Sequence, residues 1–207
     1  MDSPSSHPRP RRVRSPETRP GEILDAALAL FRERGYADTS MQHIAQAAGV
    51  ATGTVYLYFA AKDDILAACQ RRFRDGLARH VAQAVLDPMR AGQDIDLRAA
   101  LGMTACAIAR FAQENRDLCE VTLAHAAAET PGTATASQQI NHVLTQILVA
   151  ASQRGIVHAP DPEVTALLLS RMLGHSICIA AVFGDPPLER VLPVATDMAY
   201  RSLQPAP

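Results

Sequence analysis

Residues 39–62 of the chain, TSMQHIAQAAGVATGTVYLYFAAK, carry the strongest structural signal in the sequence. Helical spacing after residue 40 places four apolar side chains on one stripe: Met41, Ile44, Ala45 and Ala48. Thr39 and Gln42 have the spacing of a capping box, which predicts that the helix begins at residue 39 or 40. Gly49 permits the left-handed backbone that ends a helix. The segment therefore predicts a short helix followed by a tight turn.

A second short helix is predicted directly after this turn. It begins with small residues, Ala51, Thr52, Gly53 and Thr54, and Val55 then points inward. Small side chains let the start of a helix approach a surface closely, as docking into a DNA groove requires. Two helices joined in this way form a helix-turn-helix, and an ordinary helical hairpin in a protein core is the alternative.

The residues after the second helix favour DNA binding over a plain hairpin. Tyr56, Tyr58 and Lys62 supply two hydroxyl groups and one ammonium group, and Phe59 can anchor the segment to the core. Hydroxyl and cationic side chains make contacts with phosphate oxygens that fix the register of a protein on DNA. We therefore predict a DNA-binding segment.

Residues 23–66, ILDAALALFRERGYADTSMQHIAQAAGVATGTVYLYFAAKDDIL, resemble the TetR family of bacterial transcriptional repressors. The likeness rests on an Ala-Ala-x-x-Leu-Phe helix, then Ile-Ala-x-x-Ala-Gly-Val, Gly-Thr-x-Tyr and Tyr-Phe-x-x-Lys. The resemblance implies an all-α homodimer. Its N-terminal domain would be a three-helix helix-turn-helix domain, and its C-terminal domain a helical bundle that binds an effector and dimerises.

The resemblance also implies roles for individual residues. Residues that match Thr54, Tyr56 and Tyr58 commonly touch phosphates in the family, as do those that match Thr39 and Lys62. Residues that match Thr52, Gly53 and Tyr56 lie at or near base edges. With Gln42 and Ala51 included, the predicted DNA-contacting set is Thr39, Gln42, Ala51, Thr52, Gly53, Thr54, Tyr56, Tyr58 and Lys62.

Two positions depart from the family pattern. Ala51 stands where Ser or Thr is frequent, and Ala61 stands where a capping Asn or Ser is frequent. The loss of a cap costs about 1 kcal/mol. We expect Asp63 and Asp64 to support the next helix through its dipole instead.

Length and composition agree with an all-α protein. A chain of 207 residues holds one large domain or two small ones. Apolar residues make up 48%, and the prevalence of Ala and Leu favours helices. Residues 1–83 carry 12 Lys and Arg against 9 Asp and Glu, whereas residues 84–207 carry 8 against 12. The positive half is the one predicted to meet DNA.

We divide the chain into three functional parts. Residues 1–20 contain five Pro and five Arg, so they are predicted to form a disordered basic arm. The arm is either a solvated tail or a segment that enters the minor groove. Residues 21–83 form the predicted DNA-binding domain, and residues 84–207 form the predicted effector-binding and dimerisation domain.

Further helices are predicted from apolar spacing and from breakers. The first covers residues 21–34, and one from residue 63 to about residue 81 follows the helix-turn-helix. Pro88 and Gly92 are predicted to break the chain near residues 82–93. The second half then predicts helices over 94–114 and 116–129, one that ends before Gly155, one from Pro162 to Phe183, and one over 187–203.

The last two of these helices predict a homodimer. The segment between Val164 and Val182 is apolar on nearly all sides. Such a helix must be covered on every face, which points to a second chain across a two-fold axis. A monomer that buries the helix internally is the alternative. The predicted interface comprises Leu168, Met172, Ile179, Leu188, Val191, Leu192, Ala195 and Met198.

The C-terminal helices also predict a site for a small effector. Their Met and Phe side chains and few charges favour an apolar or weakly polar molecule. The candidate residues are Met103, Phe111, His125, Met172, His175 and Phe183. Each is also compatible with plain core packing. A regulator without an effector, constitutive or activating, is the alternative.

Other chemistry finds little support in the sequence. A soft-metal site could draw on the helical residues His125, His142, His175, Cys106, Cys119 and Cys178. Plain core residues explain these positions better, so we predict no metal and no cofactor. No H-E-x-x-H, G-x-S-x-G or Gly-rich phosphate loop is present, which disfavours the different-class alternative, an enzyme. Without an export signal or about 18 uninterrupted apolar residues, we expect a cytoplasmic protein outside the membrane.

Overall fold

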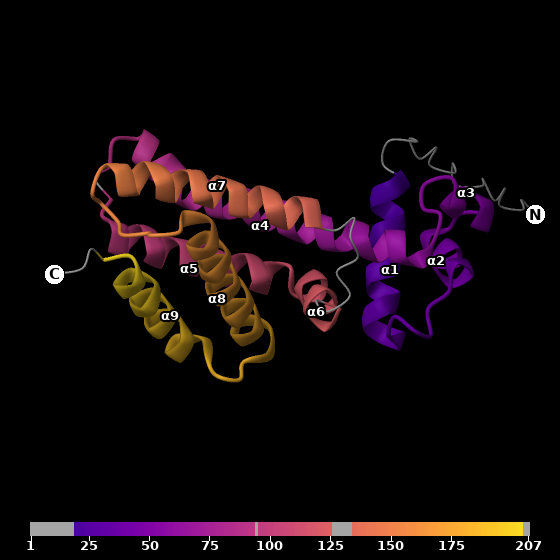
Figure 1. The fold of residues 1–207 in the computed structure, drawn as a ribbon. Coiled ribbons are helices and arrows are strands. Elements are labelled where there is room, and N and C mark those ends of the chain that lie inside the picture. Colours follow the sequence, from indigo (N-terminus) through magenta and orange to yellow (C-terminus); the bar gives the residue numbers. More distant parts are fainter. Residues whose placement is uncertain (1–18, 94, 126–133, 205–207) are drawn as a thin grey trace, which may run out of the picture. The chain divides into compact units, whose positions relative to one another are not determined.

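The computed structural model describes residues 19–93, 95–125 and 134–204 (Figure 1). Within these residues the chain is helical and contains no strand, which confirms the predicted all-α class. The chain divides into two compact units, Met1–Lys62 and Asp63–Pro207, called the first and the second unit below. Most of the predicted arm, and the segment between residues 126 and 133, lie outside the described residues. The functional boundary near residue 83 stays a prediction.

The described part of the first unit, residues 19–62, contains the helices α1 (Arg19–Arg34), α2 (Met41–Ala48) and α3 (Thr52–Tyr56). Helix α2 packs against both α1 and α3. The predicted apolar stripe of α2 is buried, which removes apolar area from water. The core of the unit consists of Ile23, Ala27, Leu30, Phe31, Met41, Ile44, Ala45, Ala48 and Val55.

The start of α2 differs from the prediction. The predicted capping box of Thr39 and Gln42 is wrong, because Ser40 is the capping residue. The Ser40 hydroxyl accepts from the backbone N–H of His43 at 3.2 Å, and His43 Nδ1 accepts from the Ser40 N–H at 3.3 Å. The hydroxyl of Thr39 donates to the carbonyl of Gly35 at 2.8 Å, so it does not cap α2.

The predicted turn at Gly49 is present. Gly49 has φ 66° and ψ 36°, a left-handed conformation that costs glycine little. The N–H of Val50 bonds to the carbonyl of Ala45 at 3.0 Å, and the N–H of Gly49 bonds to that of Gln46 at 3.1 Å. This pair of bonds is a Schellman motif, which ends α2 and sets the direction of α3.

The second unit is a bundle around one central helix. Its elements are α4 (Lys62–Arg90, whose first residue closes the first unit), α5 (Leu97–Glu114), α6 (Arg116–Ala124), α7 (Ala134–Gln153), α8 (Pro162–Phe183) and α9 (Leu188–Ser202). Helix α8 packs against α5, α6, α7 and α9, and α5 also packs against α9 (Figure 1).

Helix α4 is longer than predicted. It continues through Pro88 and ends at Arg90, so the prediction that Pro88 breaks the chain is wrong. Pro88 lies in the last turn and cannot donate to the carbonyl four residues earlier, yet the helix continues past it to Arg90. The stop comes from Gly92, with φ 82°, and from the bond between the N–H of Gln93 and the carbonyl of Pro88 at 3.1 Å.

Helix α8 agrees with its predicted bounds. The carboxylate of Asp161 accepts from the N–H of Val164 at 3.0 Å, Pro162 occupies the first turn, and Gly184 ends the helix with φ 73°. By length and composition alone α8 is apolar enough to cross a bilayer. The core helices of soluble proteins share that property, and four helices of this chain cover α8.

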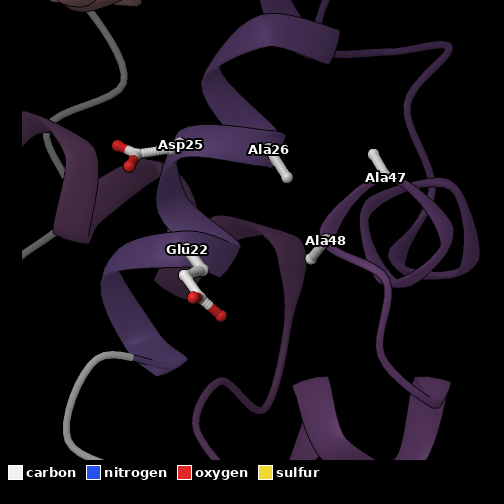
Figure 2. Close-up of a pocket in the computed structure, with 5 residues that line it drawn as sticks. All are labelled: Glu22, Asp25, Ala26, Ala47 and Ala48. Carbon is white, nitrogen blue, oxygen red and sulfur yellow. The ribbon is translucent and has the colours of Figure 1, made fainter. Parts of the chain in front are cut away.

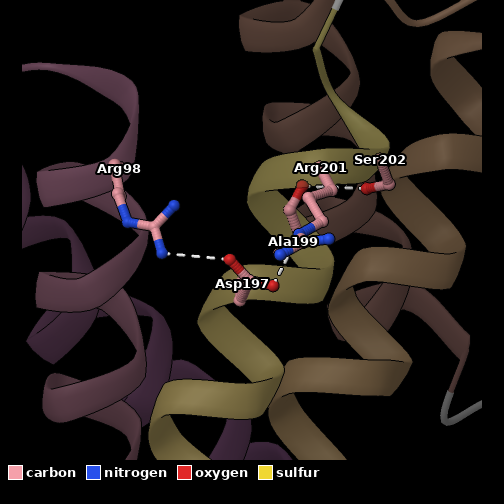
Figure 3. Close-up of polar contacts among 5 residues, drawn as sticks. All are labelled: Arg98, Asp197, Ala199, Arg201 and Ser202. Carbon is pink, nitrogen blue, oxygen red and sulfur yellow. Dashed lines mark hydrogen bonds and ion pairs between the residues drawn. The ribbon is translucent and has the colours of Figure 1, made fainter.

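Polar contacts join α5 and α9 at the surface (Figure 3). Asp197 accepts from Arg98 at 3.0 Å and from Arg201 at 2.7 Å, and Arg98 lies over the ring of Tyr200 at 4.8 Å from its centroid. Such exposed ion pairs contribute about 0–1 kcal/mol each. Burial of the apolar side chains of Ala195 and Ala199 stabilises the packing of α9 more than these ion pairs do.

Candidate nucleic-acid interface

Helix α3 has five residues, and packing holds it more than capping does. Its capping position is Ala51, whose side chain offers no oxygen, as the sequence predicted. The N–H of Thr54 bonds to the carbonyl of Ala51 at 2.8 Å. Val55 is fully buried and anchors the helix in the first unit, as predicted. An isolated helix this short would be unstable in water, so the rest of the unit keeps it folded.

The leading residues of α3 offer an open surface. Gly53 is exposed, while Thr52 and Thr54 are half-buried. A Cβ atom placed on Gly53 would meet no other atom within 4 Å. Another molecule can therefore approach the backbone at Gly53 closely, which is what contact with base edges requires.

The segment that follows α3 carries three large exposed side chains in a row. These are Tyr56, Leu57 and Tyr58, and Leu57 reaches 81% exposure. The backbone under them is fixed by bonds from the Leu57 N–H to the Gly53 carbonyl at 3.2 Å and from the Tyr58 N–H to the Val55 carbonyl at 3.0 Å. The predicted set of DNA-contacting residues lacks Leu57. Its position two residues after the inward-facing Val55 would have indicated the opposite, outer side of a helix.

Two predicted DNA-contacting residues instead contact the backbone of the protein itself. Lys62 donates through Nζ to the carbonyls of Tyr36, Ala37 and Thr39. Thr39 is only 2% exposed. The other predicted residues are exposed or half-buried: Gln42, Ala51, Thr52, Gly53, Thr54, Tyr56 and Tyr58.

A hollow of about 290 Å³ lies between α1 and α2 (Figure 2). Glu22, Asp25 and Ala26 of α1 line one side, and Ala47 and Ala48 of α2 line the other. Its two acidic side chains would repel phosphate groups. The hollow therefore does not extend the surface around α3 toward DNA.

Phe111, one of the predicted effector residues, packs tightly against α4. Its ring centroid lies 5.6 Å from that of Phe73 and 5.6 Å from that of His80. A Cβ on Gly76 would lie 2.6 Å from the ring, so only glycine allows this approach. Phe111 is a packing residue of the second unit and is still half-buried, not fully enclosed.

The remaining effector candidates fall into two groups. Met103, His125 and Met172 are half-buried, and His125 bonds through Nδ1 to the carbonyl of Val121 at 3.0 Å. His175 and Phe183 are exposed, so they do not line the interior of this chain. The structure thus separates the six predicted residues into an inner and an outer group.

The predicted dimer face is apolar and partly exposed. Leu168 is 64% exposed and Met198 is also exposed, whereas Ala195 is buried inside the chain and is unavailable to a partner. The half-buried members of the predicted face are Met172, Ile179, Leu188, Val191 and Leu192. Exposed apolar residues that the prediction missed are Val164, Leu167, Phe183 and Val194.

Among the described residues, no three His, Cys, Asp or Glu side chains are placed to hold a metal ion. Cys119 and Cys178 are buried, and Cys106 is exposed. The hydrogen bond with Cys178, together with burial, raises the pKa of the Cys119 thiol far above its usual range. Cys119 therefore stays a neutral core thiol, because the thiolate is the reactive form.

Residues 23–69 match the family described as bacterial regulatory proteins, tetR family. This range includes all of α2 and α3 together with the exposed segment that follows them. This part of the chain is a TetR-family domain. The proteins that it matches are transcriptional regulators, a family of non-enzymes.

Curated relatives with this domain match the N-terminal part of the chain. The fatty acid metabolism regulator protein of Bacillus subtilis is 51% identical over 45 residues, which are 22% of this chain and 23% of that protein. The transcriptional repressor KstR2 of Mycobacterium tuberculosis is 35% identical over 75 residues, which are 35% and 38% of the two chains. This chain therefore spans well under half of the length of these curated relatives.

A solved structure extends the likeness to the second unit. The TetR-family regulator PfmR of Thermus thermophilus is 26% identical, with a TM-score of 0.64. The alignment covers 88% of this chain and 99% of that one. The likeness of fold to a TetR-family protein therefore includes described helices of the second unit and is not limited to the helix-turn-helix.

Proposed function

We propose that this protein is a ligand-responsive transcriptional repressor that binds a near-palindromic operator as a homodimer. The observation that carries the proposal is the exposed surface of α3 and of the residues that follow it. A core hairpin would bury Tyr56, Leu57 and Tyr58, whereas in this chain all three are exposed. Exposed large apolar and aromatic side chains on adjacent positions mark an interaction surface.

In the proposed complex, α3 lies in the major groove. Thr52 and Gly53 approach base edges, and the hydroxyls of Thr54, Tyr56 and Tyr58 bond to phosphate oxygens. Leu57 supplies an apolar contact that suits the methyl group of a thymine base. The phosphate contacts orient the protein, and the contacts at base edges select the sequence.

The proposed dimer forms through α8 and α9. Val164, Leu167 and Leu168 expose apolar surface on α8, and Val194 and Met198 do so on α9. Burial of such surface is favourable at about 25 cal/mol per Å². A two-fold axis through this face would present two copies of α3 roughly 34–36 Å apart, one turn of DNA.

The proposed effector binds in the interior of the second unit, near α5, α6 and α8. Met103, Phe111, His125 and Met172 are half-buried there, and their apolar character suits an apolar or weakly polar molecule. A ligand that weakens DNA binding must itself bind more weakly to the DNA-bound protein. Fatty acids are the first compounds to test, since one relative is named as a fatty acid metabolism regulator.

Selection from a random duplex library tests the DNA-binding part of the proposal. We expect enrichment of an inverted repeat whose half-site centres lie about 10 base pairs apart. The matched control is the Ile44→Ala variant, which loses the buried anchor of α2. A wild-type pool that is no more enriched than the control pool would refute DNA recognition.

Light scattering tests the dimer. The wild-type chain should have twice the monomer mass at micromolar concentration, and Leu168→Glu should reduce it, because a carboxylate would be buried at the interface. Glu163→Gln on the exposed start of α8 is the control and should leave the mass unchanged. A wild-type monomer would rule out the proposed dimer.

Thermal shift tests the effector. A compound that binds the folded chain at 100 times its Kd stabilises it by about 2.7 kcal/mol, and a true effector must also lower operator affinity. If lipophilic compounds neither raise the melting temperature nor release DNA, the alternative regulator without an effector is favoured.

A further inference from the structure

Lys62 is the only lysine in the 207-residue chain and the first residue of α4. Its Nζ donates to the carbonyls of Thr39 at 2.7 Å, of Ala37 at 3.2 Å, and of Tyr36. An ammonium group has three N–H donors, so every donor has a partner in the protein. The ring of Tyr36 adds a cation–π contact, with Nζ 4.2 Å from its centroid.

The three carbonyls belong to the connection between α1 and α2. The chain leaves α1 at Gly35, with φ 81°, and the carbonyls of Tyr36, Ala37 and Thr39 follow in the connection. Thr39 serves the same connection, because its hydroxyl donates to the Gly35 carbonyl at 2.8 Å. We call Tyr36, Thr39 and Lys62 the connection clamp.

We propose that Lys62 is a positioning residue for the DNA-binding surface and not a phosphate contact. The clamp fixes the connection that leads into α2, and α2 carries α3 by direct packing. The inference rests on the proposed function, because the surface that the clamp positions is the one proposed to meet DNA. A phosphate contact would require Lys62 to leave several charge-assisted hydrogen bonds, which are stronger than neutral ones.

Acetylation of the wild-type protein tests the clamp without DNA. N-hydroxysuccinimide acetate needs a lone pair on Nζ. An ammonium group that donates to three carbonyls must first leave them and lose a proton before it can react. Because Lys62 is the only lysine, one peptide in a mass spectrum reports its reaction. We expect acetylation about tenfold slower than in the same chain unfolded in urea, and little further protection from a bound duplex.

The opposite pattern would overturn the proposal. If Lys62 in the folded, DNA-free protein reacts as fast as in urea, and a duplex alone protects it, Lys62 is a phosphate contact. The DNA-free comparison stays informative if the protein binds no duplex at all. Failure of the proposed function and failure of the clamp are therefore distinguishable.

Two substitutions extend the test to operator affinity. Lys62→Arg keeps the charge, and a guanidinium binds phosphate at least as well as an ammonium group. Its planar fork cannot direct three donors onto three converging carbonyls. Lys62→Met keeps the apolar stem but removes the donors. We expect both variants to lose about tenfold in operator affinity and to melt at a lower temperature, since hydrogen bonds to a charged group are lost.

The salt dependence of binding separates the two roles. With a positioning role, Lys62→Met keeps the wild-type slope of log affinity against log salt, because no phosphate contact is removed. With a phosphate role, the slope of Lys62→Met falls by about 0.9, and Lys62→Arg retains affinity. Retained affinity in Lys62→Arg together with that fall in slope would contradict the clamp.

Discussion

The first and the second unit differ in how strongly local residues, as opposed to packing between helices, determine their helices. In the first unit, single residues with specific backbone or capping roles determine where helices begin and end, such as Ser40 before α2 and Gly49 after it. In the second unit, caps such as Asp161 also mark helix ends, but the long helices are held by packing around α8, and Leu168 stays exposed at its surface. Capping and turn residues therefore determine the helices of the part proposed to bind DNA, whereas packing between helices determines those of the second unit.

The same difference appears in the comparisons with known proteins. The family match covers residues 23–69, whereas the solved structure that aligns with 88% of the chain is 26% identical over that longer alignment. A turn that needs a positive φ at Gly49 restricts the sequence strongly, whereas an apolar core accepts many side chains of suitable size. The difference between the units therefore leads to predictions about which substitutions each unit tolerates.

The largest expected effect is the loss of a core side chain in the first unit. Ile44 is 0% exposed and Ile147 of α7 is 52% exposed. We expect Ile44→Ala to lower the free energy of unfolding of its unit by about 2–5 kcal/mol, and Ile147→Ala to change stability by less than about 0.5 kcal/mol. Urea denaturation followed by circular dichroism measures both. An equal decrease in the free energy of unfolding for both variants would contradict the different burial of the two side chains.

The next effect concerns two glycines of the helix-turn-helix. Gly49→Ala should cost about 1–2 kcal/mol, because the left-handed conformation strains a Cβ atom. Gly53→Ala should instead stabilise α3 by up to about 1 kcal/mol, since its Cβ meets open space, while it lowers operator affinity. Melting curves and duplex titrations of the two variants should show opposite signs in stability. If Gly53→Ala also destabilises, the exposed surface at α3 is described incorrectly.

A smaller effect comes from the capping positions. Asp161→Ala removes the cap of α8 and should cost about 1 kcal/mol, whereas Ala51→Ser supplies the cap that α3 lacks and should add about 0.5–1 kcal/mol. Chemical denaturation resolves both changes. A destabilising Ala51→Ser would contradict the inferred start of α3.

The smallest effect belongs to the exposed ion pairs between α5 and α9. Asp197→Asn removes the partner of Arg98 and Arg201 but leaves the buried apolar contacts in place. We expect a loss below about 1 kcal/mol that shrinks further in high salt. A larger loss that salt does not reduce would mean that these side chains fix the packing of α9.

Sequence patterns predicted the elements well where local physics decides them. The bounds of α8 follow from Asp161, Pro162 and Gly184, and the end of α2 follows from Gly49. Patterns failed where a distant partner decides the outcome. The role of Thr39 as a cap was lost because its hydroxyl bonds back to Gly35 at the end of α1.

The candidate site shows the same limit. The half-buried threonines of α3 and its exposed Gly53 and Tyr56 could be predicted from the motif, and Leu57 could have been predicted from helical phase. The partners of Lys62 could not, since they lie 23 to 26 residues away in the sequence. The outward position of Phe183 also depends on how α8 packs, which apolar spacing alone does not specify.

Titration of fluorescent duplexes from the region upstream of the gene, with the wild-type protein and with Tyr56→Ala, tests the central claim most directly. Tyr56 is exposed, so its removal should leave the melting temperature unchanged while it costs about 1–3 kcal/mol of binding free energy. The account predicts saturable binding of at least one duplex by the wild type and weaker binding by the variant. Equal affinity of the two proteins, or no duplex bound by the wild type, would contradict it.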